Sequence, residues 1–465
     1  MGIRLFNTMS GRKEQFEPLE PGVVRLYTCG PTVYDFAHIG NFRAYLFEEL
    51  LRRHLEYRNH RVTQVMNITD VDDKTIAGSN RAGLSLREFT DRYLQAFFED
   101  LDTLRVKRAD IYPRATDHVA EMVEIIAALL DRGFAYQSEG DVYFRISSFP
   151  AYGRLAKLDR QGLRPGARVA VDEYDKETAT DFALWKARRP GEPSWDAPFG
   201  PGRPGWHIEC SAMSMKYLGS GFDIHTGGVD NVFPHHENEI AQSEAYSGST
   251  FVRYWLHCEH LLVDGEKMSK SKGNFHTLRD LLDAGHDPDA IRYLLLASTH
   301  YRSKLNFTES GLRASAEALR RMRTFAARVH QLEPEGEADW IVQEANDAAE
   351  HFGRALDDDL NLPLAMGYFF DLAREANSAM DRAAIGVTGK LALERLISIV
   401  DHYFDLLTDR VDGLDAELIR LIELRQQARS AKDYALADQL RDRLAEAGVA
   451  LEDSKDGVRW TRVRR

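Results

Sequence analysis

The sequence has few cysteines and no long apolar run. Only three of its 465 residues are cysteine, and Cys29, Cys210 and Cys258 lie far apart. An odd number of scattered cysteines argues against a disulfide framework and leaves reduced thiols or metal ligands. No apolar stretch reaches the roughly 18 residues of a membrane-spanning helix, and residues 1–8 do not resemble a signal peptide. We therefore expect a cytoplasmic protein with no membrane partner.

The charge balance is acidic. A formal net charge of -13 argues against broad nonspecific binding to nucleic acid, although it leaves local basic patches open. With 465 residues and 43% hydrophobic residues, the chain is too long for one core and can bury several. We expect several domains and find no internal repeat.

The first half of the chain begins with a strand, a loop and a helix. Residues 23–26 are an apolar run, residues 27–41 carry a thiol, glycines and a histidine, and residues 42–55 have helical periodicity. Residues 61–69 then alternate apolar and polar side chains, as a strand does. This βαβ order predicts a parallel sheet with a ligand site at the loop.

Later segments divide the chain further. A proline- and glycine-rich stretch ends near Gly205 and closes an insertion between two halves of the sheet. Residues 254–258 and 261–263 are expected to form a hairpin, and long helices begin near Glu309. The expected domains are residues 1–111 and 206–265 for the sheet, 112–205 for the insertion, 266–308 for a lysine-loop connection, 309–410 for a helical bundle and 411–465 for a small terminal domain.

Four side chains could hold a metal ion. His235 and Glu239 are four residues apart on a predicted helix, so they share a face, and Cys29 and Cys210 lie near strand ends. Spacing alone leaves the alternative of buried thiols and core histidines open. It also leaves competing ligands, which are His207, His225, His236, Glu237, Cys258 and His260.

Two segments indicate nucleotide binding. The sequence His38-Ile39-Gly40-Asn41 places a donor and a bare backbone at a helix start, where phosphates are often held. The loop that contains Lys267, Lys270 and Lys272 could clamp phosphates. A simple helix entry and a solvated basic turn are the alternatives.

Five strings in order resemble class I aminoacyl-tRNA synthetases, and most closely the cysteinyl-tRNA synthetases. They are residues 27–35, 67–74, 204–213, 233–243 and 267–271. The resemblance runs over essentially the whole chain. It implies an α/β fold, with a Rossmann-like parallel-sheet catalytic domain that carries an insertion, followed by an α-helical bundle and a small C-terminal domain.

The resemblance also assigns roles to residues. It implies one Zn²⁺ per subunit, held by Cys29, Cys210, His235 and Glu239. It implies that the catalytic residues are His38, Lys267 and Lys270, and that Mg-ATP is contacted by His38, Gly40, Asn41, Asp230 and Lys270. The implied contacts of the amino acid are Cys29, Thr69, Trp206 and His225. The family commonly has histidine where this chain has Asn41, which can donate a hydrogen bond but carries no charge.

The implied reaction has two steps. The carboxylate of L-cysteine attacks the α-phosphate of ATP, and the adenylate is then transferred to the terminal adenosine of cysteine tRNA. Shape alone would separate cysteine from serine by only about 1 to 3 kcal/mol, whereas a thiolate bound to zinc is a different ligand from a hydroxyl. We therefore expect no editing domain, an insertion that contacts the acceptor end, and a monomer.

The C-terminal third fits a tRNA partner. Residues 289–292 resemble the family signature at the entry to the bundle. The final Arg459, Trp460, Arg462, Arg464 and Arg465 interleave an aromatic ring with arginines, which suits stacking on unpaired anticodon bases. Three alternatives remain: a related ligase that delivers cysteine to a small sugar-derived amine, a noncatalytic tRNA-binding or zinc-sensing protein, and a hydrolase that uses Cys29 as its nucleophile.

Overall fold

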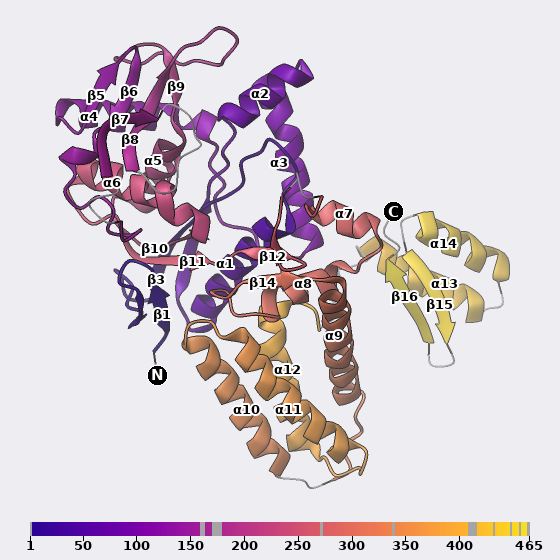
Figure 1. Cartoon of the computed structure of the whole chain (residues 1–465). Coiled ribbons are helices and arrows are strands. Elements are labelled where there is room, and N and C mark those ends of the chain that lie inside the picture. Colours follow the sequence, from indigo (N-terminus) through magenta and orange to yellow (C-terminus); the bar gives the residue numbers. More distant parts are fainter. Residues whose placement is uncertain are drawn as a thin grey trace. The chain divides into compact units, whose positions relative to one another are not determined.

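The structure is a computed structural model, and its ribbon is drawn in Figure 1. It describes residues 2–158, 163–169, 179–269, 273–336, 340–407, 416–430, 433–446, 449–454 and 457–462. The chain separates into two compact units, Met1–Asp405 and Leu406–Arg465. Within the described ranges, no helix has both the length and the apolar character needed to cross a bilayer.

The first unit holds most of the helices and strands. In chain order they are β1 Arg4–Asn7, β2 Arg12–Gln15, β3 Val23–Thr28, α1 Ile39–Tyr57, β4 Arg61–Met66, α2 Asp73–Ala82, α3 Leu86–Thr103, α4 Val119–Asp131, β5 Ala135–Ser138, β6 Asp141–Phe144, β7 Leu163–Val169, β8 Ala179–Ala187, β9 Gly202–Pro204, α5 Trp206–Leu218, β10 Phe222–Gly228, α6 Glu237–Ser247, β11 Val252–Cys258, β12 Leu261–Val263, β13 Glu266–Lys267, α7 Leu278–Asp283, α8 Pro288–Ala297, β14 Leu305–Phe307, α9 Glu309–His330, α10 Trp340–Asp357, α11 Leu362–Met380 and α12 Val387–Phe404.

A four-stranded parallel sheet organises this unit. Its strand order is β11-β10-β3-β4, and every neighbouring pair is parallel. Thr28 pairs with both Met66 and Thr226, so β3, β4 and β10 end side by side. The loops that follow these strands therefore meet at one edge of the sheet, which is where α/β folds bind ligands. The predicted βαβ unit is confirmed.

The loop after β3 approaches the end of β4 closely. A Cβ atom on Gly30 would lie 1.8 Å from the carbonyl oxygen of Asn67, so only glycine fits there. The amide of Gly30 donates to the Asn67 side chain at 2.9 Å. This contact fixes the start of the loop that carries Cys29 and leads to α1.

The insertion forms its own sheet. Four strands follow the order β5-β6-β8-β7, and β9 pairs with β8. Helix α2 is tied to this sheet, because Asp73 pairs with Lys186 on β8 and with Arg203 on β9. Burial alone would raise the pKa of Asp73, but these two cations outweigh it and lower the pKa to about 2.

The expected hairpin at residues 254–263 is wrong. β11 lies in the parallel sheet beside β10, whereas β12 pairs with β13 and β14 in a separate sheet. The buried Arg43 of α1 donates to the carbonyl oxygens of Glu259 and His260, at 2.8 and 2.5 Å. This arginine therefore satisfies the two carbonyl groups where the chain leaves one sheet for the next.

Helices α9 to α12 form the predicted bundle, and Figure 1 shows them side by side. Arg292 on α8 is fully buried and joins this bundle to the sheet. Its guanidinium donates to both carboxylate oxygens of Glu49 on α1, at 2.7 and 3.1 Å, and to the carbonyl oxygen of Phe404 at 2.8 Å. The helix that begins at the nucleotide motif is thus fastened to the bundle.

The second unit is a helix pair and a hairpin. Its elements are α13 Ala416–Ser430, α14 Tyr434–Glu446, β15 Val449–Ser454 and β16 Gly457–Arg462. A small core of Leu418, Leu421, Ile422, Leu440 and Leu444 joins the two helices, and β15 pairs antiparallel with β16. The predicted residues Arg459, Trp460 and Arg462 lie on β16, whereas Arg464 and Arg465 lie outside the described residues.

Candidate functional site

A cavity of about 420 Å³ lies where β3, β4 and β10 end. The loop between β3 and α1 forms much of its wall, and the lysine loop closes another side. Most of the predicted site residues line it: Cys29, His38, Gly40, Asn41, Thr69, Trp206, Asp230, His235 and Lys267. These residues come from five separate segments of the sequence, so the fold brings the predicted amino-acid and nucleotide residues to one cavity.

One wall of the cavity holds a cluster of metal-ligating side chains. Donor atoms of Cys29, Cys210, His235 and Glu239 all lie within 4.8 Å of one another. A second set within the same limit shares Cys29 and Glu239 but replaces the others with His225 and His236. Thiolate, imidazole and carboxylate are the ligand types that zinc takes in proteins, so the donor chemistry fits this metal.

The charges of the cluster are set by burial. Burial raises the pKa of Glu239 to about 8 and lowers the pKa of His235 to about 4. Burial also raises the pKa of the Cys210 thiol well above its ordinary value. The hydrogen bond from Cys210 lowers the pKa of Cys29, but burial and the nearby Glu239 outweigh it and raise the pKa overall. Near neutral pH these groups carry little charge without a cation.

The surroundings of Glu239 test whether the cluster fits a bound metal ion. Its Oε1 atom is buried and lies 3.1 Å from Nε2 of His235, yet it receives no hydrogen bond of acceptable geometry from any described residue. Its other oxygen lies 3.1 Å from Nε2 of His225. A buried carboxylate oxygen that receives no hydrogen bond is costly, and a cation bound between Glu239 and His235 would satisfy it. The residues present therefore fit a metal ion.

His225 lies behind the cluster and does not line the cavity. It is fully buried, stacks on Trp255 with ring centroids 4.7 Å apart, and contacts Glu239. Trp206 does line the cavity, and its ring stacks on His235 at 4.3 Å. The structure thus separates two residues that the sequence resemblance placed together against the amino acid.

Sequence reasoning missed a chain of imidazoles behind Cys29. The Cys29 thiol lies 3.2 Å from Nε2 of His236, whose Nδ1 lies 2.8 Å from Nε2 of His257. Nδ1 of His257 in turn lies 2.7 Å from the Thr8 hydroxyl. His236 was visible as a competing ligand, but a single histidine in a strand, such as His257, carries no sequence signal.

Glu209 was also missed. The Thr69 hydroxyl donates to Oε2 of this buried carboxylate at 2.9 Å, and the Asn67 amide donates to the same hydroxyl at 3.2 Å. Thr69 is therefore held firmly at the cavity wall. The adjacent positions of Glu209 and Cys210 in α5 were the available signal.

The nucleotide motif caps helix α1. The backbone amide of Asn41 donates to Nδ1 of His38, and the backbone amide of His38 donates to Oδ1 of Asn41, both at 3.1 Å. Because Nδ1 accepts, the proton of a neutral His38 is on Nε2. A Cβ atom on Gly40 would lie 3.0 Å from Nδ1 of His38, so a larger residue would press on this ring.

The described part of the lysine loop lies beside the same motif, since a Cβ atom on Gly40 would lie 3.4 Å from Cε of Met268. Lys267 and Met268 line the cavity, and Lys270 and Lys272 lie outside the described residues. Asn274 joins the two limbs of the loop, because its side chain accepts from the amide of Ser269 at 2.8 Å and donates to the Lys267 carbonyl at 3.3 Å.

A second cavity of about 710 Å³ adjoins the first. The two share Tyr34, Lys74, Tyr93 and Trp206 among their lining residues, and α2 and α3 supply much of the second wall. Aromatic rings and two cations, Lys74 and Arg81, face it.

Comparison with known proteins identifies the family. The family model described as "tRNA synthetases class I (C) catalytic domain" matches residues 15–317. The cysteine–tRNA ligase of Brachyspira hyodysenteriae is 50% identical over 471 residues, covering 99% of each chain. The chain belongs to the cysteine–tRNA ligase family. A second relative, the ligase of Chlamydia pneumoniae, is 49% identical over 463 residues, covering 98% of this chain and 97% of its own.

Solved structures place this ligase among the class I aminoacyl-tRNA synthetases by fold. Mycobacterium tuberculosis methionyl-tRNA synthetase in complex with methionyl-adenylate aligns with a TM-score of 0.62 at 15% identity, covering 84% of this chain and 92% of that one. The Agrobacterium radiobacter K84 agnB2 LeuRS-tRNA-LeuAMS complex aligns with a TM-score of 0.63 at 11% identity, covering 84% and 85%. The expected Rossmann-like α/β fold is confirmed.

The C-terminal part of this ligase also matches known families. The DALR domain matches residues 351–407, and the model described as "Cysteinyl-tRNA ligase anticodon binding domain" matches residues 411–460. An anticodon-binding end disfavours the alternative of a ligase for a small acceptor. Cys258 belongs to neither set of metal-ligating side chains, and burial raises the pKa of its thiol to about 12.

Proposed function

We propose that this ligase activates L-cysteine with ATP and transfers the cysteinyl group to the 3′ terminal adenosine of cysteine tRNA. The observation that carries the proposal is the shared cavity of the metal-ligating cluster and the nucleotide motif. Cys29 and His38 belong to one loop and both line the cavity. An amino acid bound at Cys29 would therefore have its carboxylate near a nucleotide bound at His38.

Zinc is the metal we propose for the cluster, held by Cys29, Cys210, His235 and Glu239. Two sulfur donors favour this set over the alternative with His225 and His236. A bound zinc ion would hold the thiolate of cysteine and so separate cysteine from serine. His225 then acts as a positioning residue for Glu239, which it contacts at 3.1 Å. Trp206 would cover the amino acid from the cavity side, and Thr69 would contact it.

The first step needs positioning more than a nucleophile. A carboxylate oxygen of cysteine attacks the α-phosphorus of ATP, and the bond to pyrophosphate breaks. Nε2 of His38 donates to the phosphates, and Gly40 leaves the backbone open to the nucleotide. Lys267 and Lys270 neutralise charge that grows on the phosphates in the transition state. Asn41 acts through the cap that holds His38, and Asp230, which also lines the cavity, contacts the ATP.

The second step joins the cysteinyl group to tRNA. A ribose hydroxyl of the terminal adenosine attacks the adenylate carbonyl, and AMP leaves. The adjoining cavity with Tyr34, Phe89 and Tyr93 offers aromatic surfaces on which unpaired bases of the acceptor end could stack. The insertion at 112–205 contacts that end, and the terminal unit with Trp460 contacts the anticodon. We further propose that the enzyme acts as a cytoplasmic monomer.

Pyrophosphate exchange followed by tRNA charging tests this proposal. Wild-type protein should exchange pyrophosphate into ATP with cysteine, show little exchange with serine, and then charge cysteine tRNA. Exchange without charging would support the small-acceptor ligase, and no exchange would support a noncatalytic protein.

A matched pair of variants tests the metal assignment. Cys210→Ser should lose zinc and cysteine affinity together, whereas Cys258→Ser should keep both, since Cys258 lies outside the cluster. Wild-type zinc content in Cys210→Ser would refute the assignment of Cys210 as a ligand.

A further inference from the structure

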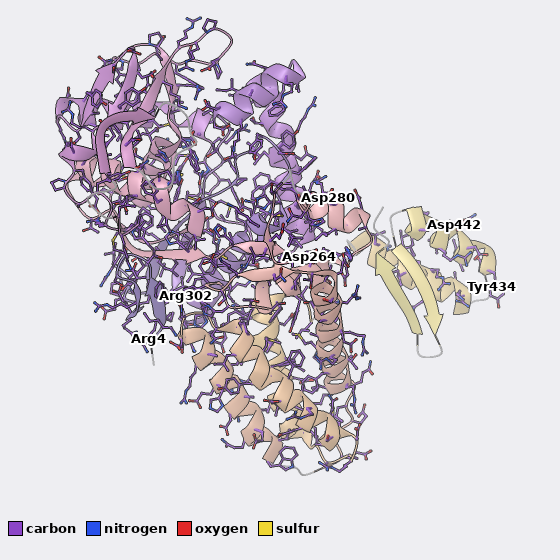
Figure 2. The ribbon with its side chains drawn as sticks, in the orientation of Figure 1. Arg4, Asp264, Asp280, Arg302, Tyr434 and Asp442 are labelled. Carbon is purple, nitrogen blue, oxygen red and sulfur yellow. The ribbon has the colours of Figure 1, made fainter. Side chains whose placement is uncertain are left out.

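Helix α7 follows the lysine loop directly and is bonded to the nucleotide motif. The backbone amide of Ile39 donates to the carbonyl of His276 at 3.0 Å, and His38 forms a β-bridge with Thr277. The ring of Phe275 meets the ring of His38 edge-on, with centroids 5.3 Å apart. Figure 2 labels Asp280, which caps α7 together with Thr277. The position of α7 therefore sets where the lysine loop ends relative to His38.

Arg279 of α7 makes several contacts with the neighbouring helix α3. Its Nη2 donates to Oε2 of Glu99 at 2.8 Å and to the carbonyl of Ala96 at 3.2 Å, both on α3. Its Nε lies 3.1 Å from Oδ1 of Asp100, a buried carboxylate. One guanidinium thus contacts three residues of α3, namely Ala96, Glu99 and Asp100.

The same guanidinium also covers a residue of the nucleotide loop. Its central carbon lies 5.0 Å from the ring centroid of Phe36. Phe36 lines the cavity and is 40% exposed. The other neighbour of this ring is Tyr93 of α3, which meets it edge-on at 5.4 Å. Phe36 is therefore held between Arg279 and Tyr93, only two residues before His38.

We propose that Arg279 is a positioning residue for adenylate formation, because it joins α7, α3 and Phe36 and so fixes residues 275–277, which follow the lysine loop, against His38. The inference rests on the proposed role of that loop in the first step. Arg279 does not line the cavity, so it acts through Phe36 and α7 and does not touch the substrates.

A purely structural role is the competing explanation. Arg279 is about one-third exposed, at 35% of its side-chain surface, and exposed ion pairs contribute little to stability. The contact of its guanidinium with the exposed Phe36 ring at the cavity rim adds little to the buried core. The contacts instead fix the distance between the loop with Phe36 and His38 and the start of α7. That distance matters because misplacing a catalytic group by about 1 Å can cost roughly 100-fold in rate.

The chain offers a matched control in Arg108. Its side chain is 34% exposed and pairs with Asp102. It also lies over a ring, Phe98, at 4.3 Å, and donates to the Phe98 carbonyl at 2.8 Å. Arg108 thus makes the same kinds of contact near the same helix, but it touches neither cavity.

The experiment compares Arg279→Ala, Arg279→Lys and Arg108→Ala in the full-length enzyme. Pyrophosphate exchange gives kcat and the KM values for ATP and cysteine, and thermal unfolding reports stability. We expect Arg279→Ala to lower kcat by about 10- to 100-fold with the KM for cysteine unchanged. Arg279→Lys should recover part of kcat, since it keeps the charge but not the planar stack. Arg108→Ala should leave kcat unchanged, and its melting temperature should fall about as much as that of Arg279→Ala.

A double-mutant cycle with Phe36→Leu tests the contact itself. If both residues act through the stack, the double variant should lose no more activity than Arg279→Ala alone. Losses that multiply, or an Arg279→Ala enzyme with the kcat of Arg108→Ala, would overturn the inference while the proposed function stands. A wild-type protein without cysteine-dependent exchange would instead overturn the proposed function.

Discussion

His38 and Asn41 each bond the backbone amide of the other, and together they cap α1 at the rim of the cavity. The asparagine therefore replaces the commoner histidine with a side chain that holds His38 in place. We predict that Asn41→Ala will lower stability by about 0.5 to 2 kcal/mol, as loss of a cap does. It should also raise the KM for ATP several-fold, because the His38 amide loses its acceptor. Urea unfolding and pyrophosphate exchange measure the two effects.

Glu88 supplies the control for this prediction. It closes the same kind of reciprocal cap with Ser85 at the start of α3, and it is exposed. Glu88→Ala should therefore cost a similar free energy of unfolding and leave the KM for ATP unchanged. Equal KM values for the two variants would show that the Asn41 cap has no role in nucleotide binding.

Zinc binding should release protons, and the number should identify the ligands. Without a cation, burial keeps the pKa of Glu239 at about 8, and the thiols of Cys29 and Cys210 also have raised pKa values. His235 is already neutral, since its pKa is lowered to about 4. At pH 7 the set with both cysteines should therefore release about three protons per zinc ion. Apparent affinity should rise steeply with pH, because metal competes with these protons.

The alternative set with His225 and His236 predicts a different result. Both imidazoles are neutral, with pKa values lowered by burial, so only Cys29 and Glu239 would lose protons, about two per ion. Zinc titration of the metal-free protein in weak buffer with a pH indicator counts them. In Cys210→Ser, which should lose zinc, the titration should release few protons, and a count equal to that of the wild type would assign the metal to the histidine set.

Trp206 should contribute to amino-acid binding through its stack on His235. Trp206→Ala removes a ring that lies 4.3 Å from the imidazole and lines both cavities. We expect the KM for cysteine to rise roughly 10-fold, in line with the loss of an aromatic contact worth about 0.5 to 1.5 kcal/mol beyond its burial. Trp206→Phe should keep most of the affinity. A KM for cysteine that stays constant in Trp206→Ala would contradict the contact.

The sequence predicted the parts of the fold that depend on local pattern. The apolar run before Cys29, the helix after His38 and the alternating strand at residues 61–69 each have their own periodicity, so the βαβ unit could be recognised before the structure was known. The helical bundle was equally visible. The expected hairpin is wrong because strand pairing depends on distant residues: β11 pairs with β10 and β12 pairs with β14, and Arg43, more than 200 positions earlier, bonds the carbonyl of Glu259 between them.

The site also divides into residues that a local motif marks and residues that only the fold brings in. Motif residues such as Cys29 and His38 could be named from the sequence, but their partners could not. His257 and Glu209 reach the site only through the packing of β11 and α5; nothing near His257 in the sequence marks it, and the one signal for Glu209 is its position next to Cys210. The cap between His38 and Asn41 was hidden for another reason, because asparagine is not the usual partner in such a cap.

The buried pair of Arg292 and Glu49 should be the strongest single tie between the bundle and α1. Arg292→Ala would leave the fully buried Glu49 without its bidentate partner, so we expect a loss of about 3 to 5 kcal/mol in the free energy of unfolding. Burial alone would raise the pKa of Glu49, but Arg292 and Arg53 outweigh it and lower the pKa. The tie therefore contributes fully above pH 4.5, the ordinary value, and is lost as pH falls through the lowered pKa.

Arg320 offers the comparison for this pair. It also bonds a glutamate with two nitrogens, at 2.8 and 2.7 Å, but both Arg320 and Glu317 are exposed. Arg320→Ala should cost far less stability than Arg292→Ala, because exposed ion pairs contribute little. Replacing both members of the buried pair, as in Arg292→Met with Glu49→Leu, should cost less than Arg292→Ala, because no charge is left buried alone. Urea unfolding at pH 7 ranks the three variants, and an Arg292→Ala protein as stable as Arg320→Ala would show that the pair does not hold the bundle to α1.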